Sequence, residues 1–212
     1  MDSYYQTRYT FDPARTTVWK EIVRFEVPFI PATGTVLDVG AGYCDFINNV
    51  TAARRIAADI SPELSKYAAP GVEQLSAPAD DMSSVANGSV DVVHASNLLE
   101  HFEDASLEKV IKEFFRVLKT GGRLILQQPN FAYSGPSYFD DPTHKKVFTH
   151  VSLKNFVESH GFKMVLLRPK FLPFSMNSRP SIVPVSSLVV RAYIASPWKP
   201  FAGQMLCIAE KI

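Results

Sequence analysis

The chain has 212 residues, 46% of them hydrophobic, and its 22 basic residues nearly balance its 21 acidic ones. This length suits one α/β domain whose core needs no disulfide for stability. The balanced charge excludes the basic surface that nucleic-acid binding requires, so we expect no nucleic-acid partner. Two widely separated cysteines and the lack of an apolar run of ~20 residues predict a cytoplasmic protein without a transmembrane segment.

The first predicted element is a helix near the N-terminus. Residues 1–14 show no regular pattern. Thr16 or Thr17 is expected to cap a helix that runs to about Phe25, because apolar residues follow at helical spacing. Pro28 then ends this helix.

An apolar strand followed by two glycines is the most informative pattern in the chain. Residues 36–39 predict a strand buried on both faces of a parallel sheet. Gly40 and Gly42 permit positive φ angles and let a ligand approach bare backbone N–H groups. A helix is expected from about Asp45, so the pattern indicates a cradle for a nucleotide.

Carboxylates beside this turn indicate which nucleotide fits it. A dinucleotide site would read G-x-G-x-x-G and would hold a diphosphate at the helix start. Here the third position is Asp45, and a carboxylate is a poor neighbour for a diphosphate. S-adenosylmethionine has no phosphate and carries an ammonium and a sulfonium, which Asp38 and Asp45 suit better. We therefore predict a site for S-adenosylmethionine, to which Asp38, Gly40 and Gly42 contribute.

Residues 36–46 resemble motif I of the class I S-adenosylmethionine-dependent methyltransferases, although the usual third glycine is Cys44. Residues 40–50 are similar to bacterial members among glycan-modifying enzymes. The resemblance implies an α/β, Rossmann-like, doubly wound sheet of seven strands, mostly parallel with an antiparallel last strand. It also implies one domain over residues 1–212, whose first thirty residues form a lid that Tyr9 or Arg15 closes. A helix that simply packs on the sheet edge is the alternative.

The second predicted strand, residues 55–60, contains the candidate ribose ligand. Asp59 follows the glycines by somewhat under ~20 residues, where a carboxylate can accept both ribose hydroxyls of an adenosine. We assign Asp59 to the ribose and include its neighbour Ile60 in the cofactor site. Asp59 would otherwise cap the next helix, but the Ser-Pro-Glu sequence after Ile60 already supplies that start.

A third strand is predicted at residues 71–75, and an acidic pair follows it. Asp80, Asp81 and Met82 resemble the family segment beside the adenine ring. The resemblance implies that Asp81, or else Asp80, binds the exocyclic amine and that the Met82 amide binds a ring nitrogen. The alternative is that both acids are turn residues.

The fourth strand, residues 90–97, places Asn97 at its carboxyl end, where open α/β sheets bind ligands. The segment after it resembles the family's link between cofactor and acceptor, in which His101 is a proton acceptor or shapes the loop. Residues 107–118 predict a helix that Asp104 or Ser106 caps, and a glycine pair ends it before a fifth strand at residues 123–128.

Beyond the fifth strand, residues 138–149 resemble the D-P-T-H-x-x-x-(F/Y)-T signature of methyltransferases in bacterial glycan biosynthesis. Pro142 rigidifies a turn that gathers carboxylates and an imidazole. Such a group can take a hydroxyl proton, hydrogen-bond a sugar or bind a divalent cation. The alternative is an Asp-Pro turn with an exposed His144. The side chains available to a cation are Asp140, Asp141, Glu100 and His144.

The C-terminal part predicts a helix capped by Ser152, a sixth strand at residues 162–167 and a last strand at residues 204–211. Between these strands, residues 168–200 are expected to form an irregular insertion rich in proline, serine and aromatic residues. Its apolar stretch, residues 188–194, is a short helix over the acceptor, a contact of a homodimer or an element at a membrane surface.

The motifs in this order imply methyl transfer from S-adenosylmethionine. A sugar hydroxyl must lose its proton as it attacks, and His144 is the predicted base because an ordinary histidine pKa of ~6.5 lies near working pH. Asp141 would orient His144, and His101 is the reserve. We predict O-methylation of a sugar hydroxyl in a glycan or glycan precursor. The alternatives are N- or C-methylation of another small molecule, a non-catalytic S-adenosylmethionine-binding partner subunit and, remotely, an NAD-dependent oxidoreductase.

Overall fold

The computed structural model describes residues 14–173 and 185–212, so the expectations for Tyr9 and its neighbours lie outside the described residues. One seven-stranded sheet forms the centre of the protein, in the order β3-β2-β1-β4-β5-β7-β6. The first five strands pair in parallel, and β7 is antiparallel to both β5 and β6. The predicted fold is thereby confirmed. The strands are β1 (Thr35–Val39), β2 (Arg54–Asp59), β3 (Val72–Ser76), β4 (Val90–Ser96), β5 (Leu118–Pro129), β6 (Phe162–Leu172) and β7 (Gln204–Lys211).

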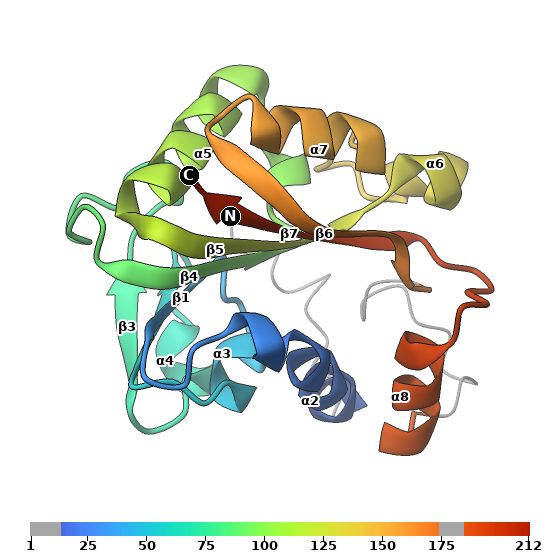
Figure 1. Ribbon diagram of the computed structural model, residues 1–212, viewed down its shortest axis with the longest axis horizontal. Helices are drawn as coiled ribbons and strands as arrows, with labels where there is room; N and C mark the ends of the chain where they lie inside the picture. The colour runs from blue at the N-terminus through green and yellow to red at the C-terminus, as the bar shows by residue number, and fades with distance from the viewer. Residues whose placement is uncertain (1–13, 174–184) are drawn as a thin grey trace.

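Helices cover both faces of this sheet. Figure 1 shows α5, α6 and α7 on one side and α2, α3, α4 and α8 on the other. The α-helices are α2 (Ala14–Glu26), α3 (Asp45–Asn49), α4 (Leu64–Tyr67), α5 (Asp104–Val117), α6 (Phe131–Ser134), α7 (His150–Glu158) and α8 (Ser187–Ala195). The described residues also form the short 3-10 helices η1 (Val27–Phe29), η2 (Leu99–His101) and η3 (Gly135–Asp140).

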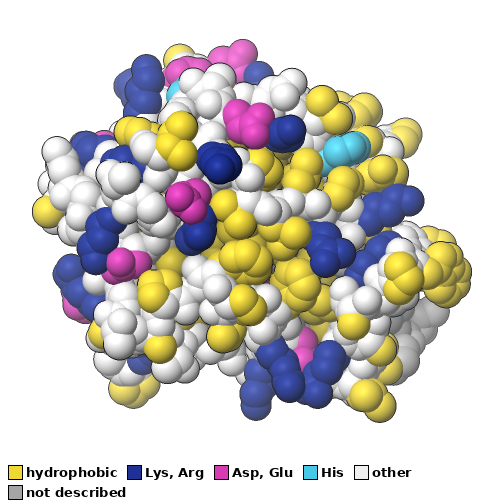
Figure 2. Space-filling view, in the orientation of Figure 1, with side chains coloured by type: hydrophobic (Ala, Val, Ile, Leu, Met, Phe, Trp, Pro, Cys, Tyr) yellow, Lys and Arg dark blue, Asp and Glu magenta, His cyan; other side chains and the backbone are white. Residues whose placement is uncertain are grey.

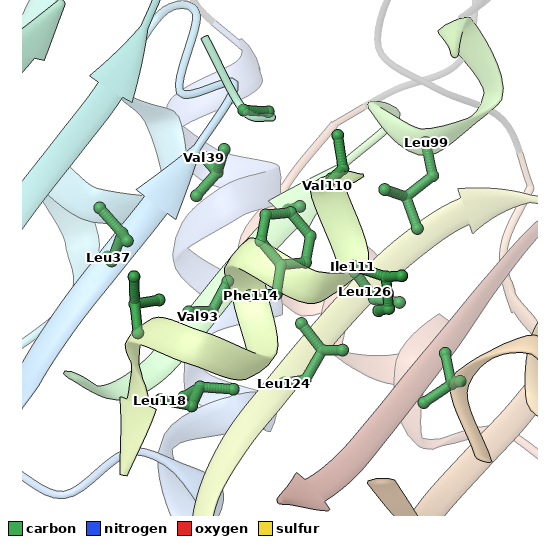
Figure 3. Packing of buried hydrophobic residues seen from close by; sticks show 14 of the residues in the cluster. Leu37, Val39, Val93, Leu99, Val110, Ile111, Phe114, Leu118, Leu124 and Leu126 are labelled. Carbon is green, nitrogen blue, oxygen red and sulfur yellow. The ribbon is translucent and has the colours of Figure 1, made fainter. Parts of the chain in front are cut away.

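Two apolar layers hold these helices to the sheet. In the layer drawn in Figure 3, α5 packs Val110, Ile111 and Phe114 against residues of β1, β4 and β5, all of them fully or almost fully buried. The other layer joins α2 and α3 to the opposite face through residues such as Trp19 and Phe46. Burial of apolar surface on both faces is the main driving force for a sheet of this kind, because it removes that surface from water.

The strand order reverses between β1 and β4, which lie side by side although β2 and β3 come between them in the chain. At such a reversal the loops after the two neighbouring strands turn to opposite sides and leave a crevice. The loops that follow β1, β2, β4 and β5 therefore meet at one edge of the sheet, where the predicted site residues lie.

Three helix boundaries differ from their prediction. Helix α2 already begins at Ala14, ahead of the expected threonine caps, and α5 has Glu103 at its N-cap, without a side-chain cap. Helix α7 begins at His150, because Thr149 and Ser152 form a reciprocal capping box, so Ser152 is the third residue of the helix and not its cap.

Two strands are longer than predicted. Strand β5 begins at Leu118, directly after α5, because Leu118 is already extended and pairs with Val90 across an irregularity in the ladder. Strand β6 continues to Leu172, so the expected insertion does not begin at Arg168. The pairing of β6 with β7 has a second irregularity between Arg168 and Leu172. Because Pro169 interrupts the strand pattern there, the sequence does not predict that pairing continues to Leu172.

The apolar stretch of the predicted insertion forms α8, which packs on α2. Arg191 donates two hydrogen bonds to the carboxylate of Glu21, while Leu188 and Val189 are exposed. Figure 2 shows hydrophobic side chains in the middle of one face, with charged side chains of both signs around them. Within the part of the chain that the structure describes, no helix is long and apolar enough to cross a membrane.

Candidate cofactor and acceptor site

The turn after β1 has the backbone that its glycines predict. Gly40 and Gly42 have φ angles of 69° and 50°, and Cys44 adopts 57°. A Cβ atom on Gly40 would lie 2.8 Å from a methyl carbon of Leu98, so a larger residue would have to displace that side chain in addition to adopting the positive φ. Cys44 takes the left-handed conformation in place of the family's third glycine, and its side chain is fully buried.

The backbone amides of this turn are not bare, which corrects one expectation. The N–H groups of Gly40 and Ala41 donate to the Ala58 carbonyl at 2.9 and 3.2 Å. The N–H of Gly42 donates to Asp59 Oδ2 at 2.8 Å. The turn is therefore tied to the end of β2. A diphosphate would need these amides, whereas a ligand without phosphate does not.

Asp59 lies at the carboxyl end of β2, as expected, and it is 8% exposed. Its two oxygens accept from the Gly42 and Ser61 amides, both at 2.8 Å. Each carboxylate oxygen has a second lone pair, so this carboxylate can still accept from ribose hydroxyls while the amides hold it in place. Ile60, directly after it, is 55% exposed and offers an apolar surface beside Asp59.

Asp38 supports the turn from inside the protein. Its Oδ1 lies 2.7 Å from Nδ1 of His94, its register partner on β4, and both side chains are buried. Burial raises the pKa of Asp38, and the neighbouring imidazole opposes that shift. His94 stacks on Phe46 with ring centroids 3.6 Å apart, which links the buried pair to α3. Asp38 thus contributes by positioning the turn.

Asp45 is paired with a cation of the protein. Arg15 of α2 reaches its Oδ2 at 2.7 Å and also lies over the Tyr43 ring. Burial raises the pKa of Asp45, and Arg15 opposes the shift. The predicted lid residue Arg15 therefore ties α2 to the cofactor turn, and Asp45 serves as its anchor.

The turn as a whole is acidic. Burial raises the pKa of the Cys44 thiol to about 12, and the charges of Asp38, Asp59 and Asp45 add to this effect. A surplus of carboxylates favours a cationic ligand such as a sulfonium over an anionic one.

The three residues predicted to contact the adenine differ in their exposure and in their hydrogen bonds. The Met82 amide donates to Glu113 Oε2 at 2.8 Å, so it is engaged within the protein, and its contact with an adenine nitrogen stays a prediction. Asp81 is exposed and accepts from the Ser83 amide, as a turn residue does. Asp80 is half-buried and is the better candidate for the exocyclic amine.

Asn97 closes the crevice from the side of β4. It has a φ of 48°, and its amide donates to the Gln127 carbonyl at 2.8 Å. This bond joins the ends of β4 and β5. Gln127, near the end of β5, and Gln204, at the start of β7, were not predicted as notable residues. Their Oε1 atoms are buried and have no hydrogen-bond partner. Polar residues at the end of an otherwise apolar strand were the available signal.

The predicted catalytic residues come together at a second group of side chains. His144 Nε2 lies 3.9 Å from Glu100 Oε1 and 3.9 Å from Asp141 Oδ2. Its Nδ1 is 2.6 Å from the Tyr138 carbonyl. A carbonyl only accepts, so Nδ1 carries the proton of a neutral ring and Nε2 presents its lone pair to the two carboxylates. His101 is next to this ring, with centroids 5.2 Å apart.

Glu100 is the most deeply buried member of this group. Its side chain is fully buried, and neither carboxylate oxygen has a hydrogen-bond partner. Burial raises its pKa to about 8, and the charge of Asp141 adds to the shift. Of the candidates for a metal ion, Glu100, His101 and His144 have ligand atoms within 4.8 Å of one another, whereas Asp140 is exposed and does not join them.

Comparisons with known proteins agree with this architecture. A sequence profile described as "Methyltransferase domain" matches residues 11–167. A search of curated proteins finds no match. A solved S-adenosylmethionine-dependent methyltransferase from Archaeoglobus fulgidus is 21% identical with a TM-score of 0.70, and the match covers 99% of this chain and 98% of that one.

Two further structures have the same fold. The 1,6-didemethyltoxoflavin-N1-methyltransferase of Burkholderia thailandensis, solved with 1,6-didemethyltoxoflavin and S-adenosylhomocysteine bound, is 16% identical (TM-score 0.63, covering 99% of this chain and 84% of that one). A Haloferax volcanii methyltransferase, solved in complex with the Trm112 methyltransferase activator, is 13% identical (TM-score 0.64, covering 95% and 99%).

The fold and the turn after β1 thus define a class I methyltransferase. The chain belongs to the methyltransferase-domain family, whose profile covers most of its length. Its cofactor is S-adenosylmethionine. The turn after β1 fits this cation, which has no phosphate, because the turn is acidic and its backbone N–H groups are already bonded within the protein.

Proposed function

We propose that the protein is an O-methyltransferase that acts on a sugar hydroxyl of a glycan or glycan precursor in the cytoplasm. The observation that carries this proposal is the position of His144, whose Nε2 lies between the carboxylates of Glu100 and Asp141. A hydroxyl must lose its proton as it attacks, whereas many nitrogen acceptors need no base. A cluster built to accept a proton therefore favours an oxygen acceptor.

His144 is the proposed proton acceptor, through Nε2. The Tyr138 carbonyl fixes its tautomer, and Asp141 stabilises the ring when it is protonated. Asp141 is itself held in place, because its Oδ1 accepts from the Thr143 amide and hydroxyl. His101 also contacts the Thr143 hydroxyl and is the reserve base.

The cofactor, when bound, supplies a methyl group on a sulfonium, which is a good leaving group. The chain contributes binding, orientation and exclusion of water. We assign the ribose to Asp59, the apolar side of the adenosine to Ile60 and the exocyclic amine to Asp80. Arg15 and α2 cover the turn, and such closure keeps water from the reacting atoms.

The cytoplasmic location is supported by Cys44 and Cys207, which are both free and buried.

The test is methyl transfer from labelled S-adenosylmethionine by the purified protein alone, over matched panels of nucleotide sugars, oligosaccharides and small amines. We expect label on a sugar oxygen. Label only on nitrogen or carbon would replace the proposal with the N- or C-methyltransferase alternative. Binding of the cofactor without transfer to any acceptor would indicate a partner subunit instead.

A further inference from the structure

A fully buried carboxyl group without a hydrogen bond needs an explanation in this fold. Glu100 lies in η2, directly after β4, and both of its side-chain oxygens lack hydrogen bonds. Its backbone carbonyl, in contrast, accepts from the Lys145 and Lys146 amides at 2.8 and 3.0 Å. The backbone is therefore fixed against the loop that contains His144, and the carboxyl group is held with one oxygen 3.9 Å from His144 Nε2. A buried carboxylate is normally paired or coordinates a metal.

Two imidazoles converge on this carboxylate from different parts of the chain. His101 is its neighbour in η2, and His144 comes from the turn after η3. One ligand atom from each of the three side chains lies within 4.8 Å of the other two. Donors bound to one ion at ~2.1 Å lie roughly 3 to 3.5 Å apart, so the side chains need to close by about 1 Å.

Neighbouring groups already orient the imidazoles as they do around metal ions. The Nδ1 of His144 is bonded to the Tyr138 carbonyl, which leaves Nε2 to face Glu100. The Nδ1 of His101 lies 3.0 Å from the Thr143 hydroxyl oxygen. A histidine that ligates a metal through one nitrogen commonly has its other nitrogen in such a hydrogen bond.

We propose that Glu100, His101 and His144 bind a divalent transition-metal ion beside the acceptor site. Two imidazoles and one carboxylate suit zinc, manganese or iron(II) and leave positions open for a substrate oxygen. Magnesium prefers oxygen ligands and is the poorer match. This inference rests on the proposed function, because the ion would hold the acceptor hydroxyl and lower its pKa. With the ion in place His144 is a ligand, and the hydroxyl proton would pass to the carboxylate of Asp141, whose Oδ2 lies 3.9 Å from His144 Nε2. Without the ion His144 accepts the proton directly.

The experiment measures metal binding in the full chain, without an acceptor. Protein stripped with EDTA is titrated with Zn²⁺, and with Mg²⁺ for comparison, by calorimetry and by metal analysis after dialysis. We expect one Zn²⁺ per chain, a higher Tm with zinc and no comparable effect of magnesium. His144→Asn and Glu100→Gln should each weaken zinc binding at least tenfold.

The matched control is His160→Asn. His160 pairs with Glu108 at 3.0 Å on the surface, outside the cluster, so this variant should bind zinc like the unaltered protein. Binding of S-adenosylhomocysteine shows that each variant is folded, and His144→Asn keeps the test valid if Glu100→Gln fails to fold. No zinc binding, or binding that neither cluster variant weakens, would overturn the inference.

Failure of the metal site and failure of the proposed function give different results. If EDTA-treated protein methylates a sugar at an unchanged rate and binds no zinc, the metal site is wrong and His144 remains the base. If zinc binds through the cluster but no sugar is methylated, the site stands and the choice of acceptor is wrong.

Discussion

At the scale of single residues, His144 Nε2 has one neighbour from its own sequence motif and one from outside it. The motif predicts a turn with Asp141 and His144 close together, and the structure places them there. Glu100 precedes His144 by 44 positions, and only the folding of η2 against the turn brings the two within 3.9 Å. The sequence named Glu100 as a candidate cation ligand, but only the folded chain shows that it is buried against His144.

Replacing His144 by asparagine should abolish most of the activity. Asparagine cannot take a proton or replace the imidazole at this position, so we expect methyl transfer to fall at least about 100-fold. Binding of S-adenosylhomocysteine, measured by calorimetry, should stay unchanged. His160→Asn is the control and should keep full activity. A His144→Asn protein with an unaltered rate would remove this residue from the mechanism.

A second residue-scale prediction concerns the proposed ribose ligand. Asp59→Asn keeps the size of the side chain but replaces one carboxylate oxygen by an NH₂ group. This donor would face a backbone N–H, and the side chain would lose one acceptor for the ribose hydroxyls. We expect the Kd for S-adenosylhomocysteine to rise at least about tenfold, from the loss of one charged hydrogen bond. Glu73→Gln, on the exposed edge strand β3, is the control and should leave the Kd unchanged.

The buried Glu26 makes stability depend on pH. Burial raises its pKa from 4.5 to about 7, with His94 opposing and Asp38 adding to the shift. As pH rises from about 4.5 to 7 the unfolded chain loses this proton first, so the folded state binds more protons and its stability falls. The loss attributable to Glu26 is about 3 kcal/mol at most.

The measurement is urea unfolding at pH 5 and pH 8. In the unaltered protein the free energy of unfolding should decrease between these values. Glu26→Gln should remove the share that belongs to Glu26, while Glu100, whose pKa burial raises to about 8, keeps the remainder. An equal decrease in both proteins would mean that Glu26 is not the group responsible.

At the scale of elements, the existence and order of the strands followed from apolar runs and turn residues, while several boundaries did not. Periodicity reports which side chains face the core, and it says little about where pairing stops. Strand β6 is longer than its pattern because β7 offers pairing partners beyond Leu167. Helix α7 starts at His150 because the Thr149 side chain accepts from the Ser152 amide in its first turn. The sequence offers Thr149 and Ser152 as caps, and only the geometry shows that Thr149 is the N-cap.

Helix α7 provides a prediction at this scale. Thr149→Ala removes the acceptor for the Ser152 amide and breaks the capping box, so the free energy of unfolding should fall by about 1 kcal/mol. Chemical denaturation measures this change. Thr120→Ala, at an exposed position in the first part of β5, is the matched control. A loss no larger than in this control would show that the box contributes little.

At the scale of the whole molecule, the proposed cofactor site lies among the loops that follow β1, β2 and β4, so a ligand there would tie together segments far apart in the chain. S-adenosylhomocysteine at 100 times its Kd should raise the free energy of unfolding by about 2.7 kcal/mol, provided that the unfolded chain does not bind it. NAD at the same concentration should have no effect. Thermal unfolding with each ligand tests this, and stabilisation by NAD alone would favour an oxidoreductase.

The sequence by itself determined the class of fold, the cofactor and the position of its turn, because these depend on local features: a buried strand, glycines at positive φ and an acid at the end of the next strand. The tertiary structure decided which polar groups are occupied and which are left over. In the folded chain the Met82 amide donates to Glu113 and Arg15 donates to Asp45. Glu100 is buried beside His144 and accepts no hydrogen bond. The physical reason is that hydrogen-bond partners and burial arise between segments that only the folded chain brings together.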